Sequence, residues 1–553
     1  MAIQRLLLLL PVAGAAFVAA SPLPRSASVR PVLPRASVPV AVVPPPLAAA
    51  LPPAVSTLRG GLLAARAPES LFNLLFLGLS GACAALVVGT RSQQQSGDSD
   101  TPAEKPEMVK AVSALKWRFL AVFWLYKMAD WLQGPYFYDV YASKIINGVQ
   151  VNSEGVARLF LMGFGSTAVF GAAIGGLVDS AGRKRGSLAF ALMYTLSALS
   201  TRASTLPLLL GGRLVGGIGT SLLFSVRRRR AIRRRNSARN SFGAQFCGTS
   251  PTAASYPQAP EAWLVSEHTR RALPPAALSQ IFGLAYFGDS LVAIGAGQLA
   301  GAVASKRGPV APFELSTLFL AAGAAIVAAT WGENFGGSAK KEAKEGEKEE
   351  GNSAGALVGE AIGEMKKDKK ILLVGAVQAL FEGAMYIFVL QWPPAIRSAL
   401  ATGGVVPYGT IFSSFMVCCM AGSTTFSALA RGGATPENIM LRMLVLATTA
   451  MGTAAGLCIG GAVVPLVAAF FAFEFCVGMY FPLVGTLRSV YLPEEYRGAI
   501  MNFFGIPLNL IVVGVFLSIG KLGLQGALLC STLALSCATV AQFCLWRLTK
   551  KAA

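Results

Sequence analysis

Acidic residues, histidine and charge of either sign are scarce in this sequence. Only 14% of its 553 residues are charged and 54% are hydrophobic, whereas a soluble domain has about a quarter charged residues. The chain has one histidine, His268, and no Cys-x-x-Cys pair among its nine cysteines. The low charge argues against a soluble globular protein. The cysteine pattern argues against a zinc site or a disulfide framework and favours small apolar core residues.

Long apolar runs occupy the chain from Leu71 onward, many of them close to the ~20 residues that a helix needs to cross a bilayer. One such segment, 71–90, precedes a polar linker, and twelve more follow it. The twelve predicted spans are 117–138, 156–178, 187–204, 206–225, 278–304, 311–331, 371–391, 407–430, 438–459, 463–487, 499–520 and 523–546. The sequence therefore predicts an all-α polytopic membrane protein with one extra N-terminal transmembrane helix.

A charge-rich stretch, "SAKKEAKEGEKEEGNSAG" (338–355), lies between the sixth and seventh predicted spans. We interpret 332–370 as a solvated cytoplasmic linker that joins two six-helix halves, 115–331 and 371–548. Basic residues are concentrated in the loops after even-numbered spans, which places those loops in the cytoplasm. The basic residues in these loops and in the C-terminal tail are Arg183, Lys184, Arg185, Arg270, Arg271, Arg431, Arg488, Arg497, Lys550 and Lys551. The opposite loops carry few, among them Lys144, Lys306, Arg307 and Lys521.

The first 68 residues contain no acid, Glu69 being the first. Residues 1–20 have a signal-like pattern, and 21–68 form a leader rich in Pro, Ala, Ser and Arg that we expect to be disordered. The combination resembles the two-part leaders of plastid proteins in algae with secondary plastids. A signal peptide followed by a spacer is the alternative. The membrane that holds the protein is thus the plasma membrane or a plastid envelope.

The loop "GGLVDSAGRKR" joins the second and third spans of the twelve and resembles a signature of the major facilitator superfamily. Gly175 allows close helix approach, Asp179 lies at a helix end where it can pair with a neighbouring helix, and Gly182 permits a tight turn. Arg183 and Lys184 hold the loop at the cytoplasmic side. We predict that these charges form a latch that breaks when the two halves rock during alternating access.

The segment "YKMADWLQGPYFYDVY" (126–141) gives a more specific resemblance. Together with "GRLVGGIGTSLLFS", "EAWLVSEH", "WGEN", "QALFEGAMYIFVLQW", "GTIFSSFM" and "GMYFP", it is similar to the molybdate-anion transporter family of the major facilitator superfamily. The resemblance extends from about Leu115 to the C-terminus. It implies a major facilitator fold and a secondary transporter that moves molybdate, a tetrahedral dianion. Sulfate or a sugar as substrate, or a receptor without transport, are the alternatives.

The insert 226–258 interrupts this resemblance with eight arginines and no acid. Residues 1–68 contribute six arginines and the insert eight, so the net charge of +21 falls to +7 without them. Removing the insert joins "SLLFS" to "APEAWLVSEH", and its ends, Val226 and Gln258, fit the codon boundaries of an intron. We interpret the insert as a retained intron that was translated. A loop that binds anionic lipid is the alternative, and no fold supports a nucleic-acid arm. Sequencing the mature transcript across this junction decides between these interpretations.

Two basic residues within predicted spans, Lys127 and Arg213, are the candidate oxyanion ligands. A dianion requires cationic or N–H donors, and a lysine or arginine in a dry cavity supplies them. Gln133 and Tyr136 lie close to Lys127 in the first span, and Gln391 occupies a corresponding position in the seventh. Because proline and glycine accompany both segments, we predict broken or bent helices there that leave polar groups free for substrate.

Four of the acids within predicted spans are candidate functional residues. Asp130 and Glu382 are predicted substrate-site residues that partner a cation or carry a coupled proton. Asp289 and Glu474 are predicted either to couple transport to a proton or to form fixed helix–helix ion pairs. The sequence shows no catalytic motif and indicates neither an enzyme nor a cofactor. The expected partners are therefore an oxyanion, the bilayer and a proton, without nucleic acid.

Overall fold

The computed structural model describes residues 68–95, 106–223, 259–335, 350–400, 405–459, 462–493 and 496–550, with the side chains of 171–180 among those left out. The leader and the insert 226–258 lie outside the described residues, so the predictions for them stay predictions.

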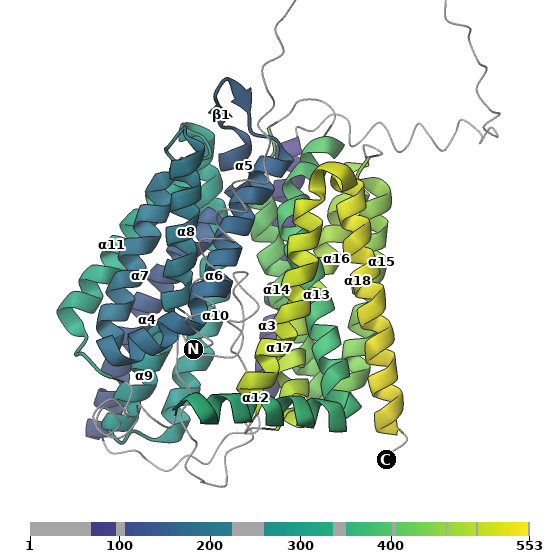
Figure 1. The fold of residues 1–553 in the computed structure, drawn as a ribbon. Helices are drawn as coiled ribbons and strands as arrows, with labels where there is room; N and C mark the ends of the chain where they lie inside the picture. The colour runs from purple at the N-terminus through teal and green to yellow at the C-terminus, as the bar shows by residue number, and fades with distance from the viewer. Residues whose placement is uncertain are drawn as a thin grey trace, which may run out of the picture. The chain divides into compact units, whose positions relative to one another are not determined.

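The first half of the helical bundle contains one helix or helix pair at every predicted span (Figure 1). Its helices are α4 (Pro106–Gln133), α5 (Phe137–Ala142), α6 (Ser153–Ala181), α7 (Arg183–Ser200), α8 (Leu206–Leu223), α9 (Ala259–Arg270), α10 (Pro275–Arg307) and α11 (Ala311–Thr330). The fourth span is represented by α8 and α9, which flank the insert. A short hairpin that the sequence did not predict, β1 (Ile145–Ile146) with β2 (Val149–Gln150), links α5 to α6.

The second half follows the predicted spans equally closely. Its helices are α13 (Lys369–Ala399), α14 (Tyr408–Arg431), α15 (Pro436–Leu457), α16 (Val463–Tyr491), α17 (Arg497–Leu517) and α18 (Ile519–Lys550). Asp368 begins α13 by accepting a hydrogen bond from the Lys370 backbone N–H at 2.8 Å, which satisfies one of the unpaired donors at a helix start. Within the described ranges, nine helices are long and apolar enough to cross a membrane.

Helix α12 (Glu350–Lys367) was not predicted, because the sequence analysis assigned 338–355 to a flexible linker. Its C-terminal residues Lys366 and Lys367 lead directly into Asp368 and α13. Figure 1 shows α12 at the end of the bundle where α13 begins, and the helix contacts α13 and α17. We call this end of the bundle the α12 end and the opposite end the closed end.

The predicted helix breaks occur in one half only. In the first span, α4 stops at Gln133, Gly134 and Pro135 turn the chain, and α5 begins at Phe137. In the seventh span, where a broken or bent helix was predicted, the helix is not broken, since α13 remains one helix through Pro393 and Pro394. A proline removes one N–H from the helical ladder but does not by itself force a turn within a packed bundle. In the first span a glycine directly precedes the proline, whereas Trp392 precedes Pro393.

The buried apolar residues form two separate clusters, and the boundary between them does not coincide with the boundary between the two halves. One hydrophobic cluster contains the second half and, continuous with it, first-half residues near the closed end such as Leu132, Tyr141 and Phe164. A separate cluster holds the first half together toward α9, and it includes Phe119, Trp263 and Trp331. The two halves therefore share an apolar core at the closed end.

The extra helix α3 (Pro68–Gln95) packs along α14 of the second half. Phe72 and Cys83 are its buried residues. The Thr410 hydroxyl donates to the Asn73 side chain at 3.5 Å near one end of the contact, and Arg431 donates to the Thr90 carbonyl at 3.2 Å near the other. The contact thus runs along most of both helices.

Candidate transport site

Polar and aromatic contacts join the two halves at the closed end. Arg397 of α13 forms an ion pair with Asp139 of α5, and its guanidinium lies 5.8 Å from the centre of the Tyr408 ring. The Tyr408 ring in turn packs edge-on against Tyr136, with centroids 5.8 Å apart. The same end holds Trp131 of α4 against Phe412 of α14 at 5.9 Å. We call these residues the gate cluster: Trp131, Tyr136, Asp139, Arg397, Tyr408 and Phe412.

Helices α10 and α14 meet backbone to backbone beside the gate cluster. A Cβ atom at Gly409 would lie 2.3 Å from the carbonyl oxygen of Gly297 and 2.7 Å from the Cα of Gly301. Ser413, one turn further along α14, donates a hydrogen bond to the carbonyl of Ile294 at 2.8 Å. Only glycine at position 409 permits this separation of the helices.

A buried ion pair of the first half is connected to the gate cluster through Trp131. The Lys127 ammonium on α4 lies 3.7 Å from Asp289 Oδ2 on α10, and both side chains are almost fully buried. The indole N–H of Trp131 donates to Asp289 Oδ1 at 2.8 Å. Asp289 therefore contacts both the predicted substrate cation and a residue of the gate cluster. The sequence analysis had named Asp130 and Glu382 as the acids that could neutralise Lys127, and the described structure adds Asp289, which forms an ion pair with it.

Arg213 on α8 is held by aromatic rings. Its guanidinium lies 4.6 Å from the centre of the Phe137 ring, and Tyr141 is close enough to interact with its charge. The head of the side chain also occupies the space beside Gly163, where a Cβ would meet it at 2.4 Å. Its Nε is buried without a hydrogen-bond partner among the described residues. No carboxylate among the described residues forms an ion pair with Arg213.

Two other residues proposed from the sequence for the first-half site, Asp130 and Gln133, have partners within that half. The hydroxyl of Tyr194 on α7 donates to Asp130. The Gln133 amide donates to the Ser316 hydroxyl of α11 at 3.1 Å. In this conformation the Gln133 amide is therefore already hydrogen-bonded to α11.

In the second half, Glu382 is buried in a polar cluster between α13 and α16. Its Oε1 accepts hydrogen bonds from the Tyr480 hydroxyl at 3.0 Å and from Arg488 at 3.2 Å. Arg488 also donates to Gln378 at 3.1 Å. The sequence analysis was wrong to count Arg488 as a loop residue, because α16 continues to Tyr491 and Arg488 is only 5% exposed. A buried carboxylate requires such a partner.

The two remaining second-half candidates are also buried. Glu474 accepts a hydrogen bond from the thiol of Cys419 at 3.0 Å and forms no ion pair with a described residue. The described residues therefore do not support a fixed ion pair at Glu474, which was one of its two predicted roles. Gln391 is 4% exposed on α13.

The loop after α6 is held by residues 331–334, which follow α11. The Glu333 carboxylate accepts hydrogen bonds from the backbone N–H groups of Lys184 at 2.8 Å and Arg185 at 3.3 Å. The Arg183 N–H donates to the Asn334 carbonyl at 3.0 Å. These contacts satisfy the first N–H groups of α7, whose start favours a negative charge. Gly182 has a φ of +107°, and a Cβ there would lie 2.4 Å from Glu333, so the close contact requires glycine.

The basic residues of this loop reach the neighbouring helices. Arg183 is 7% exposed and donates to the carbonyl of Ala262 in α9 at 3.0 Å. The Lys184 ammonium donates to the carbonyl of Ala328 at 2.8 Å. Gly175 lies in α6, and the side chain of Asp179 is outside the described residues, so its predicted pairing stays a prediction.

Helix α9 completes this network. The rings of Trp263 and Trp331 stack with centroids 3.9 Å apart, and the Trp263 indole donates to the Gly332 carbonyl at 2.9 Å. Glu267 forms ion pairs with Arg270 at 2.8 Å and Arg271 at 3.1 Å. Three motifs that are separated in sequence, "GRKR", "EAWLVSEH" and "WGEN", thus form one network, which we call the loop network.

A family of sequences described as sugar transporters with 12 transmembrane segments matches residues 71–255 and 242–480. This chain belongs to the major facilitator superfamily. The two matched regions overlap at 242–255, within the insert 226–258. The chain is 29% identical to the molybdate-anion transporter of Danio rerio over 82% of this chain and 87% of that protein. It is 28% identical to the molybdate-anion transporter of Xenopus tropicalis over 69% and 74%. The resemblance stated from the motifs is confirmed.

Solved structures place this major facilitator protein in the same fold. A peptide transporter in complex with sulfate is 12% identical, with a TM-score of 0.55 over 79% of this chain and 94% of that structure. The xylose transporter XylE of E. coli in an inward-open conformation is 10% identical, with a TM-score of 0.52 over 79% and 95%. The predicted fold, two six-helix halves preceded by an extra helix, is confirmed.

The sequence analysis missed three participants of this major facilitator site. Glu333 was inside a quoted motif, but its role depends on the approach of 331–334 to α7, which no local pattern encodes. Trp131 gave no charge signal although it links Asp289 to the gate cluster. Arg397 follows two prolines at the end of α13, and its pairing with Asp139 across 258 positions depends on the packing of the two halves.

Proposed function

We propose that this protein is a secondary transporter that moves molybdate or a closely similar tetrahedral oxyanion by alternating access. The observation that carries the substrate class is Arg213, a cation with a buried, unpartnered Nε and no ion-paired carboxylate among the described residues. The similarity to molybdate-anion transporters over most of the chain supports the same assignment. A tetrahedral dianion provides the acceptor oxygens that this guanidinium lacks.

The closed end corresponds, in this proposal, to the outer side of the membrane. Basic residues such as Arg183, Arg270 and Arg431 lie toward the α12 end, which the positive-inside rule assigns to the cytoplasm. The gate cluster then seals the site from outside. Transport requires the gate cluster to separate while the loop network and the neighbouring helices rearrange at the other end.

Asp289 provides a physical link between substrate and gate. An oxyanion that attracts the Lys127 ammonium weakens its interaction with Asp289, which also accepts from Trp131. Trp131 packs against Phe412 of the other half. Substrate binding can therefore change the stability of the closed gate. It does so if the oxyanion binds the open and closed conformations with different affinities.

Uptake measurements in a host that lacks its own molybdate transport test the proposal. The full chain should accumulate molybdate, and sulfate in excess should compete if the site recognises shape and charge alone. The description of the matched family as sugar transporters makes sugar uptake the alternative to measure in the same cells. Uptake of a neutral sugar without oxyanion uptake would refute the oxyanion assignment.

A further inference from the structure

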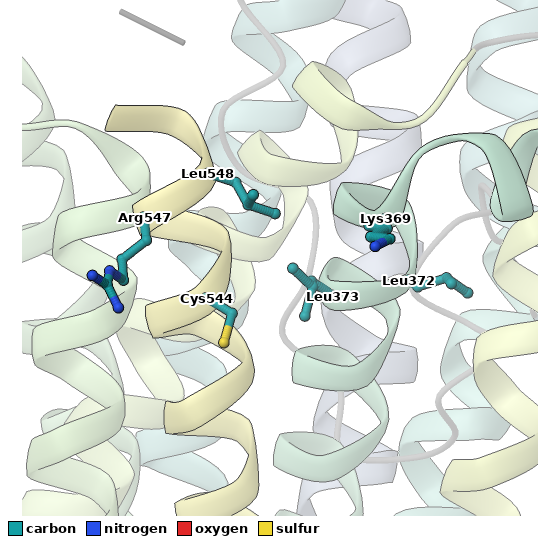
Figure 2. Close-up of a pocket in the computed structure, with 6 residues that line it drawn as sticks. All are labelled: Lys369, Leu372, Leu373, Cys544, Arg547 and Leu548. Atoms are coloured by element: carbon teal, nitrogen blue, oxygen red, sulfur yellow. The ribbon is translucent and has the colours of Figure 1, made fainter. Parts of the chain in front are cut away.

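A groove at the α12 end lies between the start of α13 and the end of α18. It is lined by Lys369, Leu372, Leu373, Cys544, Arg547 and Leu548 and has a volume of about 630 Å³. Figure 2 shows Leu373 and Leu548 directed toward the space between the two helices, with Lys369 on α13. Arg547 also lines the groove, but its guanidinium extends along the side of α18 that faces away from α13, 5.6 Å from the centre of the Phe543 ring. We propose that this groove binds an anionic phospholipid, with the phosphate headgroup near Lys369 and Arg547, the two basic residues of its lining.

The charges at the groove fit a lipid phosphate. Its lining contains two basic residues and no acidic one. The nearest acids along the chain are already engaged, because Asp368 caps α13 through the Lys370 N–H and Glu364 pairs with Lys367 at 2.7 Å. Lysine and arginine at a membrane surface attract anionic headgroups, and a guanidinium also donates hydrogen bonds to phosphate oxygens.

The apolar residues fit the remainder of the same molecule. Leu372 is 46% exposed and Leu548 39% exposed, so both present apolar surface beside the basic groups. Near the end of α18, the Lys550 ammonium lies 4.4 Å from the centre of the Trp546 ring. A tryptophan and basic residues at the end of a membrane helix are typical of the headgroup level of a bilayer. A ligand with an anionic head and apolar chains matches this arrangement of basic groups beside exposed leucines. A free phosphate would leave the leucines uncovered.

Lipid retention by the purified full-length protein tests this assignment. The protein is reconstituted in vesicles of phosphatidylcholine with or without phosphatidylglycerol, extracted in a neutral detergent and analysed by native mass spectrometry. We expect phosphatidylglycerol to be retained in preference to phosphatidylcholine, and the preference to fall with rising salt. The double variant Lys369→Gln/Arg547→Gln should bind phosphatidylglycerol about 30-fold more weakly, which corresponds to ~1 kcal/mol for each basic residue.

A matched control removes two exposed basic residues at the closed end, Lys306→Gln/Arg307→Gln, and should leave retention unchanged. Equal loss in both double variants would show a nonspecific charge effect and overturn the assignment. Equal retention of the two lipids would also overturn it. Inorganic phosphate that displaces phosphatidylglycerol at similar concentration would instead identify a site for a soluble anion. None of these outcomes depends on molybdate transport.

Discussion

Arg397 on α13 and Asp139 on α5 form an ion pair that connects the two halves of the protein at the closed end of the bundle. The Arg397 side chain is 49% exposed and that of Asp139 18% exposed. Because water reaches the pair, it stabilises the closed end only as much as a partly solvated ion pair does. Such pairs contribute about 0.2–1 kcal/mol. That amount changes the ratio of closed to open gate by up to ~5-fold.

Exchanging the two charges tests this pair. Arg397→Gln and Asp139→Asn should each increase opening of the closed end and change the rate of molybdate uptake. Because the interaction is electrostatic, the charge swap Asp139→Arg/Arg397→Asp should restore part of the wild-type rate. Accessibility of a cysteine introduced by Ser413→Cys, labelled with a membrane-impermeant maleimide in a Cys537→Ser/Cys544→Ser background, reports the opening. A swap no better than either single variant would show that the ion pair does not hold the gate.

Gly409→Val should prevent the closed end from forming. The added side chain would overlap the backbone of Gly297 and Gly301, so α10 and α14 must separate. Labelling of the same reporter cysteine should rise and uptake should slow. Gly456→Val is the matched control, because a Cβ at Gly456 meets no atom within 4 Å. Unchanged labelling in Gly409→Val would contradict the close helix contact.

Arg213→Gln should weaken molybdate affinity by about 10–150-fold, since a charge-assisted hydrogen bond contributes about 1.5–3 kcal/mol. Arg213→Lys should recover only part of that affinity, because the charge remains while the fork geometry is lost. The matched control Arg202→Gln removes an exposed arginine that pairs with Glu314. Concentration dependence of uptake at equal membrane abundance measures these effects. Equal loss in Arg202→Gln would count against a specific role for Arg213.

Lys127→Gln leaves Asp289 buried without its cation and should reduce membrane abundance, because an unpaired buried charge costs about 3–5 kcal/mol. The double variant Lys127→Gln/Asp289→Asn should regain abundance, since neither charge then remains. If Lys127 also binds the oxyanion, that double variant should still fail to transport. Immunoblots of membranes together with uptake separate the two roles. Uptake restored along with abundance would assign Lys127 to structure alone.

Glu333→Ala should lower the free energy of unfolding by about 0.5–2 kcal/mol, because it removes the acceptor for two N–H groups at the start of α7. Glu333→Gln keeps an acceptor oxygen and should cost less. Glu314→Ala, which removes a carboxylate from a surface ion pair, is the control. Denaturant titration of the purified protein measures the difference. A Glu333→Ala protein as stable as the Glu314→Ala protein would argue against the capping role.

Hydrophobic length predicted the helices of the fold, and the predicted spans and the observed helices agree within a few residues at most ends. Glycine followed by proline at 134–135 correctly indicated the break in the first span. At Pro393 the helix does not break, because a helix packed on several sides can continue without one backbone N–H. Helix α12 was missed since its charged and small residues favour solvent and give no long apolar run.

The candidate residues of the site were easier to predict than their partners. A charge within a span is visible in sequence, so Lys127, Arg213 and Glu382 could be named. Their partners depend on how helices pack, which one sequence does not encode locally. Asp289 and Arg488 were both noticed, but the first was not matched to Lys127 and the second was placed in a loop.

The packing of α3 against α14 has a consequence for the order in which this protein is assembled. The hydrogen bond between Asn73 and Thr410 joins residues 337 positions apart, with the entire first half synthesised between them. Helix α3 therefore leaves the ribosome long before its partner exists and must first be surrounded by lipid or by the insertion machinery. Because native contacts of such separation form late, this helix docks only after the second half has begun to enter the membrane. A chain that stalls before α14 would consequently display Phe72 and Cys83, apolar surface by which quality control can distinguish an unfinished transporter from a complete one.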